Sequence, residues 1–102
     1  MTIEGLPLNS NKSLSGNGGA IYNGQYGVIY VNNVDDGSKT YYSSFNSNES
    51  EYDGGAVYNI GVMEFDSVTF NANKTNSVMG RGGAVFNNNV LSIDETSKFT
   101  AN

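Results

Sequence analysis

The chain has no cysteine, no histidine and no tryptophan, and only one proline. The absence of cysteine and histidine excludes disulfides, thiolate or imidazole metal sites and the usual nucleophile–base pairs of covalent catalysis. Basic residues are also scarce: five stand singly along the sequence against ten acidic residues, which gives a net charge of −5. Because such a chain has no basic patch for a nucleic-acid backbone, we expect no nucleic-acid partner. We also expect no cofactor.

The chain also lacks an apolar run long enough to cross a membrane, and no secretory signal begins at Met1. Charged residues make up 15% of it and hydrophobic residues 37%, whereas glycine and asparagine are abundant, at 13 and 16 residues. This composition is lean for a compact globule and suits a thin solenoid with a narrow core. We expect no membrane insertion of this segment, and we expect any signal or anchor to lie outside it.

One six-residue motif occurs three times, in the order Gly-Gly-Ala, aliphatic, aromatic, asparagine. The copies lie at residues 18–23, 54–59 and 82–87, which places them 36 and 28 residues apart. Repeats of this length are typical of solenoids, in which each repeat is one supersecondary unit stacked on the next.

Each motif copy is followed by a short apolar run and then by Phe-x-x-Asn, and these three later segments end at Asn48, Asn73 and Asn102. Apolar and polar residues alternate within the runs, which is the period of a half-buried strand. Residues 1–4 and 8–11 fit the same two segments, so the chain opens with a partial fourth copy.

The repeats predict an all-β fold, a right-handed parallel β-helix of about three and a half coils with two or three short strands in each coil. We expect one β-solenoid segment over residues 1–102, with a partial coil at 1–15 and coils at about 16–50, 51–79 and 80–102. The mid-repeat start indicates a fragment of a longer array.

Stacked coils place equivalent residues above one another. The motif asparagines and the Phe-x-x-Asn asparagines should then form two ladders of amide side chains. The apolar columns should form the core, and nine residues are expected to point inward: Ile29, Val31, Met63, Phe65, Leu91, Ile93, Phe45, Phe70 and Phe99.

The alternation of Gly-Gly-Ala-Ile/Val with Phe-x-x-Asn resembles the repeats of the polymorphic outer-membrane proteins of chlamydiae and of related autotransporter passengers. The resemblance covers essentially the whole chain, although the chain lacks the many cysteines of chlamydial members. It implies a parallel β-helix displayed on a bacterial cell surface, outside the cell, that acts in adhesion.

Carboxylates are the remaining candidates for catalysis. Asp66 and Asp94 occupy equivalent places on adjacent coils, Asn32 lies one coil away, and Glu95 is next to Asp94. Paired acids at such positions could serve a polysaccharide hydrolase, but repetition along an array favours turn residues that face water. We therefore expect no catalytic residue.

Other polar motifs have structural interpretations as well. Asp35-Asp36-Gly37 lacks the spacing of a calcium loop and reads as a turn, and the glycine clusters at 16–19 and 80–83 lack the Lys-Ser/Thr ending of a phosphate loop. Asn11, Asn48 and Asn73 begin glycosylation sequons, but an asparagine that points into a ladder cannot carry a glycan. We expect no metal site.

Two features indicate a binding surface. The first repeat is about ten residues longer than the others, and its excursion from Val34 to Ser44 contains Asp35, Asp36, Tyr41 and Tyr42. Tyr22, Tyr58 and Phe86 have the opposite parity to the inward aliphatic column, so they should form an outward stack of rings. A structural role, in which the rings only shield the sheet, is the alternative.

The sequence therefore favours a non-catalytic adhesin or stalk module that binds a host-cell protein or glycan. Two alternatives stay open: a filament subunit that stacks end to end through unpaired strand edges, and a fragment of a polysaccharide lyase or hydrolase.

Overall fold

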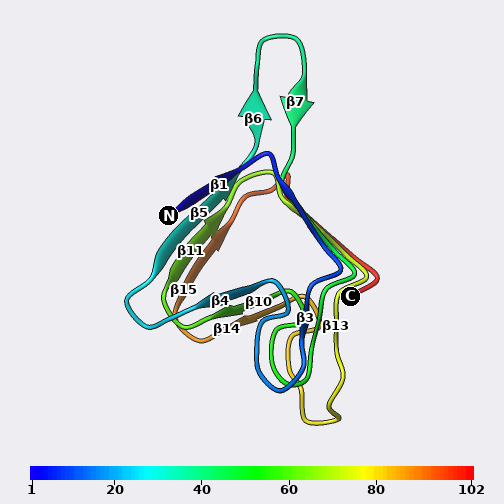
Figure 1. Ribbon diagram of the computed structural model, residues 1–102. Coiled ribbons are helices and arrows are strands. Elements are labelled where there is room, and N and C mark those ends of the chain that lie inside the picture. The colour runs from blue at the N-terminus through cyan, green and yellow to red at the C-terminus, as the bar shows by residue number, and fades with distance from the viewer.

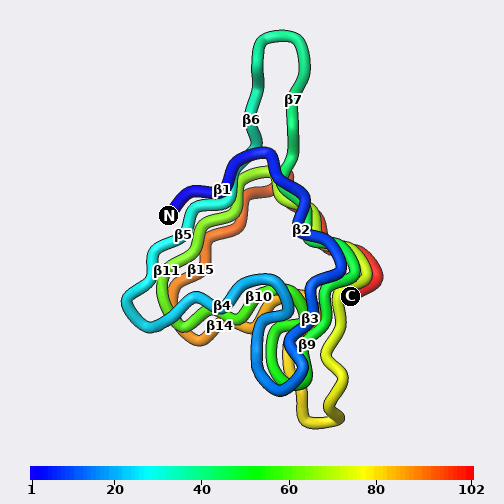
Figure 2. The backbone as a smooth tube through the Cα atoms, viewed as in Figure 1, coloured from blue at the N-terminus to red at the C-terminus, as the bar shows by residue number.

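The computed structural model describes residues 1–102 and consists of sixteen short strands without a helix. Seen along its axis, the chain winds in stacked coils of roughly triangular outline, and the coils recede from the viewer as the chain turns clockwise (Figures 1 and 2). The winding is therefore right-handed, and neighbouring strands of successive coils pair in parallel. The prediction of a right-handed parallel β-helix is confirmed. No helix is long and apolar enough to cross a membrane.

Two four-stranded sheets form two sides of the triangle. The first sheet, in spatial order, is β1 (Thr2–Glu4), β5 (Val28–Asn32), β11 (Val62–Phe65) and β15 (Val90–Ile93). The second sheet is β2 (Pro7–Asn9), β8 (Ser44–Asn46), β12 (Thr69–Asn71) and β16 (Lys98–Thr100).

Two three-stranded sheets complete the coils. The third sheet is β3 (Lys12–Ser13), β9 (Glu49–Ser50) and β13 (Lys74–Thr75), and the fourth is β4 (Ile21–Asn23), β10 (Val57–Asn59) and β14 (Val85–Asn87). A complete coil thus has four strands, and the expectation of two or three was too low. The strands of the third sheet have only two residues, so they carry no alternation that a sequence pattern would reveal.

The register of the sheets matches the aligned repeats residue by residue. Val57 pairs with Ile21 and Val85, and Met63 pairs with Ile29 and Leu91. The partial first copy also fits, because Ile3 pairs with Val31 and Leu8 with Phe45.

The core is a column of side chains along the axis. Phe70 stacks on Phe45 with ring centroids 4.7 Å apart and on Phe99 at 4.6 Å, with the rings nearly parallel in both pairs. Of the nine residues expected to point inward, six are fully or almost fully buried: Ile29, Val31, Phe45, Met63, Phe65 and Phe70.

The other three expected core residues lie in the last coil and are less buried than predicted. Ile93 and Phe99 are each 43% exposed, and Leu91 is partly buried. They keep the same register, but β15 and β16 are edge strands whose side chains have a coil on one side only. Burial in a solenoid therefore depends on a neighbour above and below.

Both predicted asparagine ladders are present. In the first, the Asn23 amide donates to Asn59 Oδ1 at 2.7 Å and the Asn59 amide donates to Asn87 Oδ1 at 2.8 Å. In the second, Asn48 donates to Asn73 at 3.0 Å and Asn73 donates to Asn102 at 2.8 Å, while Asn11 donates to Asn48. Asn48 and Asn73 are buried, so neither of these two sequon asparagines is free to accept a glycan, whereas the third, Asn11, is exposed.

Two kinds of corner connect the first three sheets. We call the segments 9–11, 46–48, 71–73 and 100–102 the asparagine corner, since each ends in a ladder asparagine. Its central residue has a positive φ of 55° to 57° in all four coils, although none is glycine: Ser10, Ser47, Ala72 and Ala101.

We call the segments between the first and second sheets the variable corner. It has one residue at Gly5 and at Ser67, which have φ values of 58° and 57°, and two residues at 95–96. In the second coil, it expands into the stretch 33–42, which contains the antiparallel hairpin of β6 (Val34–Asp35) and β7 (Thr40–Tyr41). The hairpin projects from the coil stack at this corner (Figure 1).

The glycine pairs have separate roles. The first glycine of each pair has a positive φ of 68° to 69°, a conformation that only glycine adopts without strain. The second lies against the next coil: a Cβ on Gly55 would run into the carbonyl oxygen of Gly83 and the backbone of Lys74. The motif therefore sets both the turn and the spacing between coils.

Candidate ligand-binding surface

The hairpin tip is closed by its own carboxylates. Asp36 Oδ1 accepts hydrogen bonds from the backbone N–H groups of Ser38 at 3.0 Å and Lys39 at 2.9 Å, and Asp35 Oδ1 accepts one from Gly37 at 2.9 Å. The backbone donors lower the pKa of Asp36. The two carboxylates therefore act as turn-forming groups at the tip, in accord with the turn interpretation of Asp35-Asp36-Gly37.

The two tyrosines of the hairpin have different surroundings. Tyr41 pairs with Val34, lies against Gly5 of the first coil, and has the Lys39 ammonium 4.9 Å from its ring centroid. Tyr42 is 56% exposed and stands at the foot of the hairpin. Tyr41 thus helps to seat the hairpin on the coil stack, whereas the ring of Tyr42 is free to contact a ligand.

The additional segment ends earlier than the predicted stretch from Val34 to Ser44, because its last two residues belong to the coil. Ser43 is completely buried, its Oγ donates to Asn32 O at 2.9 Å, and that Oγ accepts from the Leu6 N–H at 3.2 Å. Ser44 belongs to β8. Both serines are coil residues, so the additional segment lies within 33–42.

A half-open groove of about 560 Å³ lies at the foot of the hairpin. Its lining comes from three coils and consists of Tyr42, Ser67, Thr69, Glu95, Thr96 and Lys98. Its volume is in the range of small-molecule sites, and five of its six lining residues are polar or charged. Of the predicted site residues, only Tyr42 belongs to this groove.

Next to the groove, the carboxylate of Asp94 is used by its own corner. It accepts hydrogen bonds from the Ser67 N–H at 2.9 Å and from Ser97 Oγ at 2.7 Å, and Thr96 Oγ1 also donates to it. These donors hold the pKa of Asp94 well below its usual range. The Asp66 carboxylate accepts from Ser67 Oγ at 3.1 Å. The two acids thus serve as corner-forming groups, in accord with their interpretation as turn residues rather than as a hydrolytic pair.

The second group of predicted residues lies elsewhere. Tyr22, Tyr58 and Phe86 point outward from the fourth sheet and stack with centroid distances of 5.0 and 5.1 Å. This sheet is on the opposite side of the coil outline from the hairpin (Figure 1). The seven predicted residues therefore form two separate surfaces.

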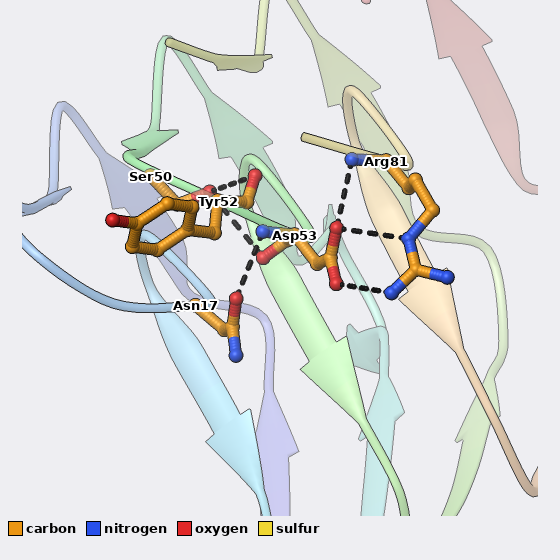
Figure 3. A network of polar contacts seen from close by, with 5 residues as sticks. All are labelled: Asn17, Ser50, Tyr52, Asp53 and Arg81. Carbon is orange, nitrogen blue, oxygen red and sulfur yellow. Dashed lines mark hydrogen bonds and ion pairs between the residues drawn. The ribbon is translucent and has the colours of Figure 1, made fainter. Parts of the chain in front are cut away.

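One end of the aromatic stack is covered by Arg81, whose guanidinium carbon lies 4.6 Å from the centroid of the Phe86 ring. Asp53 holds this arginine: its Oδ2 accepts from the guanidinium at 2.8 Å, and its Oδ1 accepts from the Arg81 N–H at 2.9 Å (Figure 3). The ion pair raises the pKa of Arg81 and lowers that of Asp53. The Asp53 N–H donates to Asn17 Oδ1 at 2.9 Å. Three successive coils are thus linked beside the stack.

This coverage leaves Tyr22, which is 58% exposed, as the open end of the aromatic stack. The arrangement supports a structural role for the rings at least as well as a binding role. No group of three or more histidine, cysteine or acidic residues is placed to hold a metal ion.

Sequence reasoning did not place five of the groove residues at a binding surface, and it considered Glu95 only as a neighbour of Asp94. Ser67, Thr69, Glu95, Thr96 and Lys98 are ordinary surface types, come from two coils and share no motif. The only available signal was indirect: the coil alignment places Ser67 and Glu95 at the same corner as the long excursion.

Residues 42–60 match the family model of the Chlamydia polymorphic membrane protein repeat. The match begins at Tyr42 and covers β8, β9 and β10 with the second Gly-Gly-Ala copy. No curated protein and no solved structure matches the chain. The family match agrees with the resemblance derived from the repeats.

Proposed function

Because residues 42–60 match the family model of the Chlamydia polymorphic membrane protein repeat, we propose that the chain is a non-catalytic adhesive module displayed at a bacterial cell surface. It binds a host-surface protein or glycan through the variable corner. The single observation that carries this proposal is the hairpin: it is the only antiparallel strand pair in a stack of parallel coils, and it presents exposed aromatic side chains.

The coil stack is a suitable support for such a segment. The asparagine ladders and the buried phenylalanine column fix successive coils, and the hairpin leaves the stack between two strands whose registers it does not change. Loops on rigid scaffolds are the usual place for recognition, since they can vary at little cost to the core.

The carboxylates support binding rather than cleavage. Asp94 and Asp66 are hydrogen-bonded within their corners, and Asp53 is paired with the only arginine. In the groove, Glu95 is the one acidic side chain, whereas glycoside hydrolysis generally uses two. An assay for depolymerisation of acidic and neutral polysaccharides should therefore show no activity. If the parent chain cleaved a polysaccharide and the Glu95→Gln variant did not, the non-catalytic proposal would be contradicted.

The test is a deletion of the hairpin, with its bounds chosen by comparison with the corresponding corners of the other coils. Deletion of residues 34–42 leaves Asn33 as the single corner residue, as Gly5 and Ser67 are in their coils. Asparagine tolerates the positive φ of this position better than most residues. The excised chain should keep its coil stack and melt within about 5 °C of the parent chain, because loop length contributes little to stability.

Binding is then measured with beads coated with the chain and presented to cultured host cells. The excised chain should bind no better than uncoated beads. A matched control is the double variant Val78→Ser/Met79→Ser, which alters two exposed residues of a different loop and should bind normally. Undiminished binding by the folded, excised chain would overturn the proposal.

Self-association through the last coil is the second candidate, since Ile93 and Phe99 expose apolar surface on edge strands. The sheets argue against regular stacking: two have four strands and two have three, so a second copy placed on β15 and β16 leaves the other two sheets unpaired. Sedimentation of concentrated chain should show monomers, and electron microscopy that reveals fibres would favour the filament.

A further inference from the structure

We infer that the groove at the foot of the hairpin is a subsite for a neutral saccharide ring. The inference rests on the proposed adhesive function and names the chemistry of its ligand. It starts from the six lining side chains, which combine one aromatic ring with three hydroxyl groups, one carboxylate and one ammonium.

The ring of Tyr42 supplies a flat apolar wall. Its side chain follows β7 directly and is 56% exposed, and no other aromatic ring stacks on it. A pyranose presents one face of C–H groups, which packs on such a ring, and leaves its hydroxyls at the edge for polar contacts. The position of Tyr42 at the hairpin foot places this wall beside the corner residues of the next two coils.

The polar groups of the groove have unused hydrogen-bonding capacity. Ser67 and Thr96 hydrogen-bond to each other at 2.7 Å, but Thr69 Oγ1 and the Glu95 carboxylate have no partner within the protein. Thr69 is half-buried and Glu95 is exposed, so both groups are open to hydrogen bonds from the hydroxyls of a ligand. A carboxylate accepts from two neighbouring hydroxyls, which matches the vicinal diol of a sugar.

Lys98 differs from every other basic residue of the chain. Lys12 and Lys74 pair with Glu49, Arg81 pairs with Asp53, and Lys39 lies over the ring of Tyr41. The Lys98 ammonium has neither a carboxylate nor a ring partner, and it lines the groove. An unpaired cation among paired ones is the group expected to donate to a ligand oxygen.

The charges select the ligand class. One carboxylate and one ammonium cancel within the groove, and the chain as a whole carries a net charge of −5. A phosphate or nucleic acid would meet Glu95 with only one cation to offset it. An apolar peptide side chain would leave the charges of Glu95 and Lys98 without partners. A neutral, hydroxyl-rich ring uses both charges and the aromatic wall.

The experiment is a titration of the isotopically labelled full chain, followed by amide chemical shifts, with the methyl glycosides of glucose, galactose and mannose. At least one glycoside should shift amides at residue 42, residues 67–69 and residues 95–98, with the millimolar dissociation constant expected of a single sugar ring. Tyr42→Ala and Glu95→Gln should each weaken binding by about tenfold or more. Tyr26→Ala, which removes a more exposed tyrosine outside the groove, should leave binding unchanged.

Absence of shifts with all three glycosides, or shifts confined to the stack of Tyr22, Tyr58 and Phe86, would overturn the subsite. This failure is distinct from failure of the adhesive function. A chain that adheres to cells but binds no glycoside keeps the function and loses the subsite. A chain that binds glycosides in the groove but no cells loses the function.

Discussion

The asparagine corner and the variable corner bound the same sheet, yet the first is constant in length and the second varies from coil to coil. The asparagine corner has one residue in each of four coils, with a φ between 55° and 57° and a laddered asparagine directly after it. The variable corner has one, ten, one and two residues, and its side chains differ from coil to coil.

The difference follows from where the hydrogen bonds are made. At the asparagine corner, Asn73 Oδ1 accepts from both the backbone N–H and the side-chain amide of Asn48, and the Asn73 side-chain amide donates to Phe45 O and to Asn102 Oδ1. An inserted residue would break this set. At the variable corner, the coils are also joined, for example by the Ser67 N–H to Asp94 and the Leu6 N–H to Ser43 Oγ, but these bonds differ from one pair of coils to the next. No ladder runs through all four coils there, so the chain can lengthen. One corner therefore holds the coils together, and the other is available for recognition.

The largest effect is expected for Phe70, whose ring precedes the asparagine corner and has a coil on both sides. Phe70→Ala should lower the free energy of unfolding by about 3–5 kcal/mol, because it leaves a cavity in the central column. Phe99→Ala is the matched control in the same column. Phe99 is 43% exposed, so its loss should cost less than about 2 kcal/mol. Equal losses of unfolding free energy for the two variants in chemical denaturation would contradict the role of the central column.

Asn73→Ala should have the next largest effect on stability, since it removes the side-chain amide that makes four hydrogen bonds. Leaving buried partners unsatisfied should lower the free energy of unfolding by about 3 kcal/mol. At the variable corner, Ser67→Ala removes only exposed side-chain bonds and should cost less than about 1 kcal/mol. Urea titrations of both variants would sharpen the comparison, and a larger loss for Ser67→Ala would reverse it.

Glu49 adds a pH-dependent contribution next to the asparagine corner. It bonds Lys12 at 2.7 Å and Lys74 at 3.5 Å, and the hydrogen bond from Lys12, then that from Asn76, lowers its pKa from 4.5 to about 2. A lowered pKa means that the folded state binds the proton less tightly. The stabilisation is therefore full above pH 4.5 and is lost as the pH falls toward 2.

The measurement is a series of melting temperatures from pH 6 to 2 for the parent chain and for Glu49→Gln. The parent chain should be the more stable at pH 6. The difference between the two should shrink as Glu49 becomes protonated, and other carboxylates cancel because both chains contain them. A constant difference across this range would show that the ion pairs contribute nothing.

The smallest effect should be a gain. Ala72 is exposed and has a φ of 57°, which is unfavourable for a residue with a Cβ. Ala72→Gly removes that strain and should raise the free energy of unfolding by about 0.5–1 kcal/mol, net of the greater freedom of glycine when unfolded. Ala20→Gly is the control: it removes a methyl group that packs against the core, so it should lower the stability of the chain instead. A thermal shift downward for Ala72→Gly would show that the corner is not strained.

Most of the fold could be predicted because the sequence repeats it. Three copies of the Gly-Gly-Ala motif fix the register of Ile21, Val57 and Val85 without any knowledge of distant contacts. The half-exposed Phe99 could not be predicted from its motif, since the motif is the same as that of Phe70 and only the neighbouring coil differs.

The candidate site was predictable only in part. The length of the excursion pointed to the variable corner and to Tyr42, but the end of the excursion was misplaced because Ser43 and Ser44 look like loop residues in the sequence. The groove depends on which side chains remain unpaired. Lys98 has no partner, whereas Lys12 and Lys74 share Glu49. This difference depends on the three-dimensional placement of the side chains and leaves no signal in the sequence.

The most direct test of the two-corner account is to insert the same nine-residue Gly/Ser segment after Ser67 in one chain and after Ala72 in another. The two sites are the one-residue corners of a single coil. Equilibrium unfolding in urea should find the Ser67 insertion within about 1 kcal/mol of the parent chain, because only loop closure is added. The Ala72 insertion should lose about 3 kcal/mol or more, because it displaces Asn73 from the ladder. Equal tolerance of both insertions would contradict the account.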